Sequence, residues 1–310
     1  MLLDIISVAA GMVLLYFGAE GLVRGSVSLA RHFKLTPLAI GLTVVAFGTS
    51  MPELVVSVGG ALSGAAAIAA GNVVGSNVAN IALILGLSAL LHPLTVNARV
   101  VRVEVPVMVS VTLAGIVLLR DQMLGRVEGA LLITGLLVYT VWILRAARRQ
   151  TAGTVHAEVL PSEMGTQRSL AFVIGGLTLL VAGARLLVSG GVSLAEALGV
   201  SEAVIGLTIV AVGTSLPELA TSVLAAARRE GDIAVGNIVG SNIFNLLGIL
   251  GAASLARPLD GTGMSAVDLG VMLALGLLLL PLARTGWRLG RVEGGLLFAG
   301  YAGYLVYLLS

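Results

Sequence analysis

Two glutamates within long apolar stretches are the residues best suited to chemistry in this sequence. Glu53 ends the segment GTSMPE at 48–53, and Glu218 ends the similar segment GTSLPE at 213–218. An ionised carboxylate in hydrocarbon is costly, so such a group is paired, protonated or used for function. Arg24 and Arg185 are the basic residues inside apolar stretches, but they do not occupy equivalent positions relative to the two segments. A bound cation is therefore the simpler partner for two equivalent acids.

The proline in each segment adds backbone oxygens to the carboxylates. Pro52 and Pro217 lack an N–H and crowd the carbonyl four residues earlier, which frees carbonyls near Gly48 and Gly213. In a bilayer, a free carbonyl is tolerated only where protein, water or an ion satisfies it. Hard cations bind carbonyl, hydroxyl, amide and carboxylate oxygens. The two segments therefore predict a cation site.

A second pair of motifs supplies hydroxyl and amide oxygens. The sequence GNVVGSNVAN occupies 71–80, and GNIVGSNIFN occupies 236–245. On a helix, Ser76 and Asn80 are four residues apart and share a face, as do Ser241 and Asn245. The glycines of these motifs are better explained by close helix packing. We expect the four segments to meet in a cage of oxygens that carries two formal negative charges.

The chain repeats itself at an offset of 165 residues without a gap. The stretch 71–86 matches 236–251 at ten of sixteen positions, and LGRVEG at 124–129 returns at 289–294. Residues 1–145 and 169–310 are therefore predicted to be two equivalent units, joined by a polar linker at 146–168. The alternative explanation of the repeat is that the unit was duplicated for packing alone, as in a scaffold or a channel.

Composition places these units in a membrane. The chain is 57% hydrophobic and 11% charged, against about 25% charged residues in soluble domains. Ten apolar spans are predicted, at 3–30, 36–62, 66–91, 99–119, 125–144, 169–198, 201–227, 232–255, 264–283 and 290–309. Because each half has an odd number of spans, the second half enters the membrane from the opposite side. The predicted fold is an all-α integral membrane protein with ten transmembrane helices in two inverted five-helix repeats, in which helices 2 and 7 are broken.

The distribution of basic residues predicts the orientation. With the N-terminus outside, 13 Lys and Arg residues fall on the inner side and 3 on the outer side, which fits the positive-inside rule. Both termini are then outside, the loop 145–168 is cytoplasmic, and the expected location is the cell (inner) membrane. The first span lacks a basic leader and is expected to be retained. The absence of cysteine excludes thiolate metal sites and disulfides, and the three histidines form no ligand cluster. We expect no nucleic acid and no obligatory protein partner.

At these paired motifs the sequence resembles the cation/calcium exchanger superfamily, specifically its prokaryotic sodium/calcium exchanger branch, over essentially the whole chain. The resemblance implies that Glu53 and Glu218 are carboxylate ligands shared by calcium and sodium. It implies a larger set of oxygen ligands from the neighbouring segments: side-chain or backbone oxygens of Thr49, Ser50, Thr214 and Ser215, the carbonyls of Ala46 and Ala211, and Ser76, Asn80, Ser241 and Asn245 at sodium sites or along the ion passages.

The resemblance also leads to expectations about mechanism. Some relatives, including the potassium-dependent branch, carry aspartate where this chain has Asn245, so potassium co-transport is not expected. The first and sixth helices would be mobile and control access to the site. The implied function is secondary active antiport of about three sodium ions for one calcium, a ratio taken from the resemblance, with the ions as cargo and no resident cofactor.

Two other functions remain open at this point. A proton/calcium antiporter could use the same glutamates, because a carboxylate accepts either ion. A passive cation channel fits less well, since channel selectivity rings come from several subunits around one axis. No nucleophile, base and orienting group assemble outside the predicted cage, so an enzyme is not expected.

Overall fold

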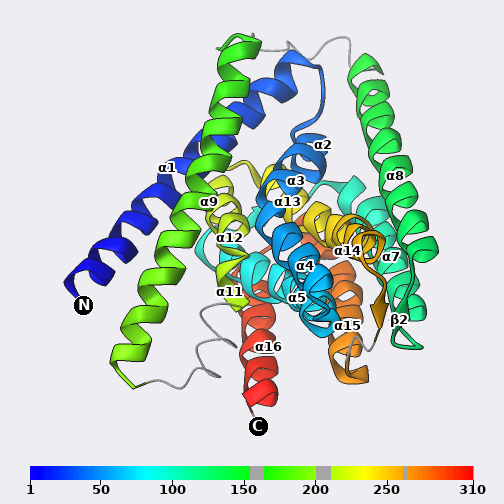
Figure 1. The fold of residues 1–310 in the computed structure, drawn as a ribbon. Helices are drawn as coiled ribbons and strands as arrows, with labels where there is room; N and C mark the ends of the chain where they lie inside the picture. The colour runs from blue at the N-terminus through cyan, green and yellow to red at the C-terminus, as the bar shows by residue number, and fades with distance from the viewer. Residues whose placement is uncertain (154–163, 200–210, 261–263, 310) are drawn as a thin grey trace.

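The computed structural model describes residues 1–153, 164–199, 211–260 and 264–309, which are helical apart from short connections and four two-residue strands (Figure 1). The helices of the first half are α1 (Leu2–His32), α2 (Pro37–Ile40), η1 (Gly41–Val45), α3 (Ala46–Thr49), α4 (Met51–Ser63), α5 (Ala66–Ala79), η2 (Asn80–Leu85), α6 (Gly86–Leu91), η3 (Val100–Glu104), α7 (Val105–Leu118) and α8 (Arg126–Gly153). Those of the second half are α9 (Thr166–Ala197), α11 (Ala211–Gly213), α12 (Leu216–Ala227), α13 (Gly231–Phe244), η5 (Asn245–Ile249), α14 (Leu250–Ala256), α15 (Ala266–Arg284), η6 (Thr285–Trp287) and α16 (Arg291–Leu309). The strands are β1 (Leu94–Thr95), β2 (Met123–Leu124), β3 (Leu259–Asp260) and β4 (Arg288–Leu289). The segments η1, η2, η3 and η5 are π-helical, and η6 is a 3-10 helix.

Seven helical runs in the described part of the chain are long and apolar enough to cross a membrane. They are Leu2–His32, Ala66–Leu91, Val100–Leu118, Arg126–Arg149, Thr166–Ala197, Gly231–Ala256 and Ala266–Trp287. The bent pair Pro37–Thr49 and Met51–Ser63 makes an eighth if it counts as one span. Each of these eight overlaps one of the ten predicted spans.

The other two predicted spans, 201–227 and 290–309, are not among these eight, and part of the predicted linker is helical. The span 201–227 lies partly outside the described residues, and its described remainder includes the shorter apolar helix α12. The span 290–309 coincides with the 19-residue helix α16, which is not among the seven. Helix α8 continues to Gly153, so residues 146–153 of the predicted linker are helical. The remaining linker residues at 154–163 lie outside the described ranges.

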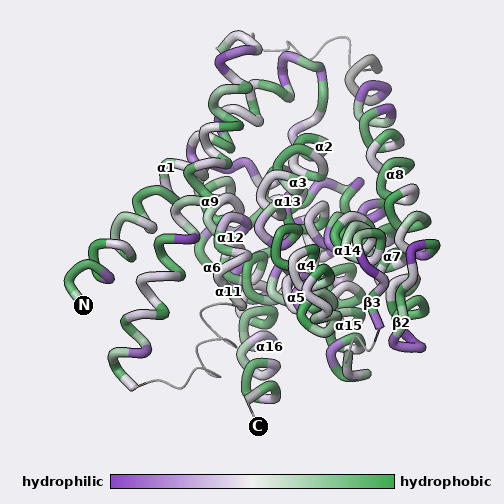
Figure 2. Tube along the Cα trace, in the orientation of Figure 1, coloured by the Kyte–Doolittle hydropathy of each residue, from purple (hydrophilic) through white to green (hydrophobic). Residues whose placement is uncertain are grey.

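The two helical runs that carry the asparagine motifs form the centre of the molecule (Figure 1). In Gly231–Ala256 the whole of the most apolar stretch is buried, and in Ala66–Leu91 the buried share is 78%. In α1 and α9 the corresponding shares are 22% and 28%, and apolar residues dominate along both helices (Figure 2). An apolar exterior around a buried polar motif is the arrangement expected of a protein in lipid.

Helices α1 and α9 lie side by side, and glycines set their separation (Figure 1). A Cβ on Gly18 would lie 2.8 Å from the backbone nitrogen of Leu180, and a Cβ on Gly176 would lie 2.6 Å from that of Leu22. Real Cβ atoms do not approach backbone atoms this closely. The two backbones are therefore in direct contact, as in other membrane helix pairs with small residues at the interface.

Two adjacent glycines of α9 allow this packing to be tested. Gly176 faces α1, whereas a Cβ on Gly175 would meet no atom within 4 Å. Gly176→Ala is expected to lower the free energy of unfolding by about 1–3 kcal/mol, because the added methyl group separates the helices. Gly175→Ala should be neutral or slightly stabilising, since alanine favours a helix. Thermal unfolding of both variants in one detergent measures the difference, and equal melting temperatures would contradict the close packing.

The short strands connect the two halves in a symmetric way. Leu94 in β1 pairs with Leu289 in β4, and Leu124 in β2 pairs with Leu259 in β3. The offset of 165 residues relates Leu94 to Leu259 and Leu124 to Leu289, so it converts one pairing into the other. Each strand pairing therefore joins the two halves through residues equivalent to those of the other pairing.

Both segments that end in glutamate interrupt a helix. Pro37–Thr49 and Met51–Ser63 meet at a bend of 48° around Ser50. In the second half, α11 ends at Gly213 and α12 begins at Leu216, with a turn between them. Each proline sits at the start of the following helix, where a missing N–H costs no hydrogen bond.

Candidate functional site

The two interruptions meet in the interior through their serines and glutamates. Glu53 and Glu218 lie in the first turns of α4 and α12 and are each 1% exposed. The Ser215 hydroxyl donates to Glu53 Oε1 at 3.0 Å, and the Ser50 hydroxyl donates to Glu218 Oε1 at 2.9 Å. Each carboxylate is thus held by a serine of the opposite half.

Neither carboxylate is neutralised by a basic side chain among the described residues. The ion pairs in this part of the chain involve other acids: Asp4, Glu20 and Glu104. Arg24 pairs with Glu20, and Arg185 lines a pocket between α4 and α9. The alternative in which these arginines compensate the two glutamates is therefore not what the structure contains.

Oxygen atoms without hydrogen-bond partners gather on the residues predicted to bind cations. Among the described residues, those buried and unpartnered oxygens include Oε2 of Glu53 and Glu218, Oδ1 of Asn80 and Asn245, and Oγ of Ser241. A buried polar atom without a partner costs about 1–3 kcal/mol, so such a concentration requires a reason. Carboxylate, amide and hydroxyl oxygens are the ligands of hard cations. The donor set suits calcium and sodium.

Asn80 and Asn245 are held by hydrogen bonds from their Nδ2 groups to asparagines of the opposite half, and their Oδ1 atoms have no hydrogen-bond partner. Asn80 Nδ2 donates to Asn242 Oδ1 at 2.9 Å, and Asn245 Nδ2 donates to Asn77 Oδ1 at 2.9 Å. Asn77 and Asn242 each donate to the backbone carbonyl of the other at 3.3 Å. Since each Nδ2 is engaged, Oδ1 of Asn80 and Asn245 remains available to a cation.

Asn77 and Asn242 are positioning residues that the sequence did not identify as part of the site. Both belong to the repeated motifs, and a third asparagine in each motif was the available signal. Ser57 and Ser222, one helical turn after the glutamates, were also missed. Ser57 accepts a hydrogen bond at 2.9 Å from the first asparagine of the motif, Asn72, and Ser222 accepts the equivalent bond at 3.0 Å.

The other predicted residues occupy different positions around this centre. Thr49 is buried, and its hydroxyl lies 3.1 Å from both the Val45 carbonyl and Asn237 Oδ1. The Ala46 carbonyl accepts the backbone N–H of Ser50 at 3.1 Å, so it is not an unsatisfied oxygen.

Three predicted residues have no bond that defines their role. Ser76 is buried on α5. Thr214 lies in the turn before α12 and lines the pocket between α4 and α9, and its Oγ1 is also buried without a hydrogen-bond partner. Ala211 begins α11, and its side chain lies outside the described part of the chain.

The site is approached by a pocket on one side of the molecule. This pocket has a volume of about 470 Å³ and lies between α4, α9 and α11. Its lining includes the predicted site residue Thr214, together with Arg185 and with Pro52, which precedes Glu53 in the chain. The position equivalent to Arg185 in the first half is Glu20. There α1 is joined to α12 by the ion pair between Glu20 and Arg228, so the two equivalent helix contacts differ.

A bundle of apolar helices around buried carboxylate, amide and hydroxyl oxygens is typical of a membrane protein that transports cations. The chain belongs to the sodium/calcium exchanger protein family, whose model matches residues 3–145 and again residues 168–310. It is 38% identical over 319 residues to the inner membrane protein YrbG of Escherichia coli (strain K12), with 99% of this chain and 97% of the relative covered. It is 31% identical over 336 residues to the sodium/calcium exchanger MaX1 of Methanosarcina acetivorans, with 96% of each chain covered.

A solved structure is similar over the same length. The sodium-calcium exchanger NCX_Mj, soaked with zero sodium and calcium, matches with a TM-score of 0.86 and 34% sequence identity over 99% of both chains. The family and the structure together identify the chain as a transmembrane cation/calcium exchanger, an antiporter rather than an enzyme. The predicted resemblance to the exchanger superfamily is confirmed.

Proposed function

We propose that this chain exchanges sodium for calcium by alternating access, with Glu53 and Glu218 as ligands shared by both ions. The observation that carries the proposal is the gathering of unpartnered oxygens on both glutamates, both terminal asparagines of the motifs and Ser241. These atoms come from both halves of the chain. A cation bound among them would replace the hydrogen bonds that the protein itself does not provide.

Charge favours calcium as one of the two cargo ions. Two carboxylates supply a charge of about −2, which one calcium ion neutralises. Asn80 and Asn245 add oxygens without adding charge, so three sodium ions would leave the centre at about +1. A neutral amide at Asn245 also supports exchange without potassium. These arguments concern ions as substrates, and the proposal includes no resident cofactor.

The arrangement of the two halves supports the remaining parts of the proposal. The gapless repeat and the exchange of contacts between β1–β4 and β2–β3 favour ten helices in two inverted repeats, with helices 2 and 7 broken. The excess of basic residues on one side of the predicted spans favours an orientation with both termini outside and the loop 145–168 in the cytoplasm. The proposed location is the cell (inner) membrane.

The contrast between the two ends of the site supports alternating access. The pocket on the α4–α9 side is lined by Pro52 and Thr214, beside the glutamates. The pocket on the equivalent α1–α12 side is lined by the ion pair of Glu20 and Arg228 and by no residue predicted to bind cations. Transporters with inverted repeats change access by moving one set of helices against the other. Helices α1 and α9 are in direct backbone contact, so we propose that they move together.

Shared ligands predict competition between the two ions. Sodium at ten times its own dissociation constant should weaken the apparent calcium affinity about ten-fold or more. Calcium must weaken sodium binding by the same free energy at matched occupancies, because linkage is reciprocal. Calorimetric titration of calcium at several sodium concentrations, with choline holding ionic strength constant, measures the effect.

The same titration separates sodium coupling from proton coupling. If the apparent calcium affinity does not change with sodium but changes with pH, the glutamates carry protons and the sodium assignment is wrong. If neither ion competes with calcium, the shared cage itself is contradicted.

A further inference from the structure

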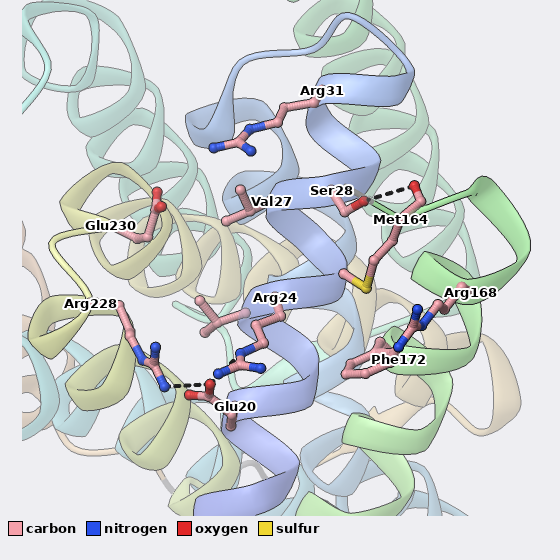
Figure 3. A pocket seen from close by; sticks show the side chains of 11 residues that line it. Glu20, Arg24, Val27, Ser28, Arg31, Met164, Arg168, Phe172, Arg228 and Glu230 are labelled. Atoms are coloured by element: carbon pink, nitrogen blue, oxygen red, sulfur yellow. Dashed lines mark hydrogen bonds and ion pairs between the residues drawn. The ribbon is translucent and has the colours of Figure 1, made fainter. Parts of the chain in front are cut away.

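A second pocket with a different chemistry lies between α1, α9 and the end of α12. Its volume is about 640 Å³, and no residue assigned to the cation site lines it. Six charged residues surround it (Figure 3): Glu20, Arg24, Arg31, Arg168, Arg228 and Glu230. Four guanidinium groups face two carboxylates, so the lining carries a net charge of about +2. A cation would be repelled from this pocket, and an anion would be attracted.

The pairing within the pocket leaves positive charge uncompensated. Oε1 of Glu20 binds both Arg24 and Arg228, so one carboxylate serves two guanidinium groups. Arg31 and Glu230 both line the pocket, and the Arg31 guanidinium lies on the side of Glu230 (Figure 3). Arg168 lies over the ring of Phe172, 5.9 Å from its centroid. Among the described residues Arg168 has no acidic partner within ion-pair distance.

Arginines from separate elements favour a phosphate group as the ligand. A guanidinium presents its N–H groups as a planar fork that matches two oxygens of a phosphate. Arg31 comes from α1, Arg168 from α9 and Arg228 from the residue that follows α12. Figure 3 shows Arg228 and Arg168 on opposite sides of α1, so the positive charge is spread along the pocket. A phosphate in the pocket would contact part of this lining and reduce its excess charge.

The surroundings of the pocket favour a lipid as the source of that phosphate. Val23, Val27 and Phe172 also line the pocket. Beside Phe172, the outer surface of α9 exposes Leu170 and Ile174, at 48% and 57%. Figure 2 shows hydrophilic residues at this end of α1 and α9 and mainly apolar residues along the rest of both helices. The pocket thus lies where a polar end meets an apolar flank, as the headgroup and acyl chains of a phospholipid require.

We propose that this pocket binds the phosphate of an anionic phospholipid, whose acyl chains lie along the apolar outer surface of α1 and α9. Basic pockets between transmembrane helices on the cytoplasmic side bind anionic headgroups in this way. The pocket is at the end of the molecule that carries the start of α9, and Met164 and Arg168 of its lining belong to the stretch 145–168 that is proposed to be cytoplasmic. The bound lipid would lie against the common end of α1, α9 and α12.

Native mass spectrometry of the full chain tests this proposal directly. Protein in a neutral detergent is titrated with phosphatidylglycerol or with phosphatidylcholine of the same acyl chains. We expect preferential binding of phosphatidylglycerol, and a loss of at least about ten-fold in its affinity for the double variant Arg31→Gln/Arg168→Gln, which removes two positive charges from the pocket. The double variant Arg31→Lys/Arg168→Lys keeps the charges and should bind more tightly than the glutamine variant.

A matched control separates the pocket from general surface charge. Arg145→Gln/Arg284→Gln removes two exposed arginines that do not line the pocket, and its affinity for phosphatidylglycerol should equal that of the wild type. Equal binding by the wild type and Arg31→Gln/Arg168→Gln, with both folded by melting temperature, would overturn the proposal. If the double glutamine variant does not fold, the single variant Arg168→Gln is compared with the wild type instead. The proposal then still requires a measurable loss of affinity for phosphatidylglycerol.

An arm with inorganic phosphate distinguishes a lipid from a soluble ligand. If millimolar phosphate displaces phosphatidylglycerol completely and stabilises the protein as much as the lipid does, the pocket serves a soluble phosphate and the lipid assignment is wrong. Calcium binding by the pocket variants should equal that of the wild type. A failure of calcium binding in all forms would instead count against the exchanger proposal and leave the lipid result intact.

Discussion

Glu53→Gln is expected to reduce calcium transport about 100-fold or more while the protein still folds and inserts. The substitution keeps the volume of the side chain but removes one of the two charges that balance calcium. Loss of one partner from a buried charge pair costs about 2–5 kcal/mol, and each 1.4 kcal/mol corresponds to about ten-fold in affinity. Glu218→Gln should have a similar effect, because Ser50 and Ser215 hold the two carboxylates in equivalent ways.

Calcium flux into proteoliposomes measures the loss of transport, and the melting temperature in calcium-free buffer shows whether the variant still folds. In the absence of cations, Glu53→Gln should be at least as stable as the wild type, since it removes an uncompensated buried charge. Glu128→Gln is the matched control, because Glu128 also lies in the first turn of a helix but is outside the site. Near-normal calcium flux in Glu53→Gln would show that this carboxylate is not a ligand.

Asn242→Ala is expected to weaken calcium binding about ten-fold and to lower the free energy of unfolding by about 2 kcal/mol or more. Asn242 is 2% exposed, and its Oδ1 accepts the hydrogen bond that orients Asn80. Without it, Asn80 Nδ2 loses its partner, and the amide is free to rotate its oxygen away from the cation. Calcium titration well below the melting temperature separates the loss of affinity from the loss of stability.

Ser88→Ala serves as the control for truncating a buried polar side chain. Ser88 is 0% exposed, its hydroxyl has no hydrogen-bond partner among the described residues, and the equivalent residue of the second half is Ala253. We expect little change in either quantity for this variant. If Asn242→Ala binds calcium as tightly as Ser88→Ala does, Asn242 has a role in packing only.

The main candidate site residues stand out in the sequence because membrane burial makes their types informative. A carboxylate or an asparagine in hydrocarbon needs a partner, and the gapless repeat showed that Glu53, Glu218, Asn80 and Asn245 occur as equivalent pairs. In the structure each of these four residues is buried and carries an oxygen without a hydrogen-bond partner. The finer assignment of each one to calcium or sodium stays a prediction.

The supporting network could not be predicted, because helical spacing alone does not show how two halves face each other. Asn77 and Asn80 are close in sequence, yet Asn77 bonds across to the second half and orients Asn245. The chain also becomes π-helical from Asn80 and from Asn245 onward, which changes the direction of the following side chains relative to a regular α-helix. Contacts between α1 and α9, which are far apart in sequence, are likewise set by tertiary packing.

Calcium uptake into proteoliposomes driven by an imposed sodium gradient tests the exchanger proposal most directly. Purified protein is reconstituted with sodium inside, and diluted into calcium with choline outside at equal pH on both sides and without potassium. The proposal predicts rapid calcium uptake that disappears when choline replaces the internal sodium. Glu218→Gln should also abolish this uptake. Uptake that persists without a sodium gradient and follows an imposed pH gradient would contradict it and assign the two glutamates to proton exchange.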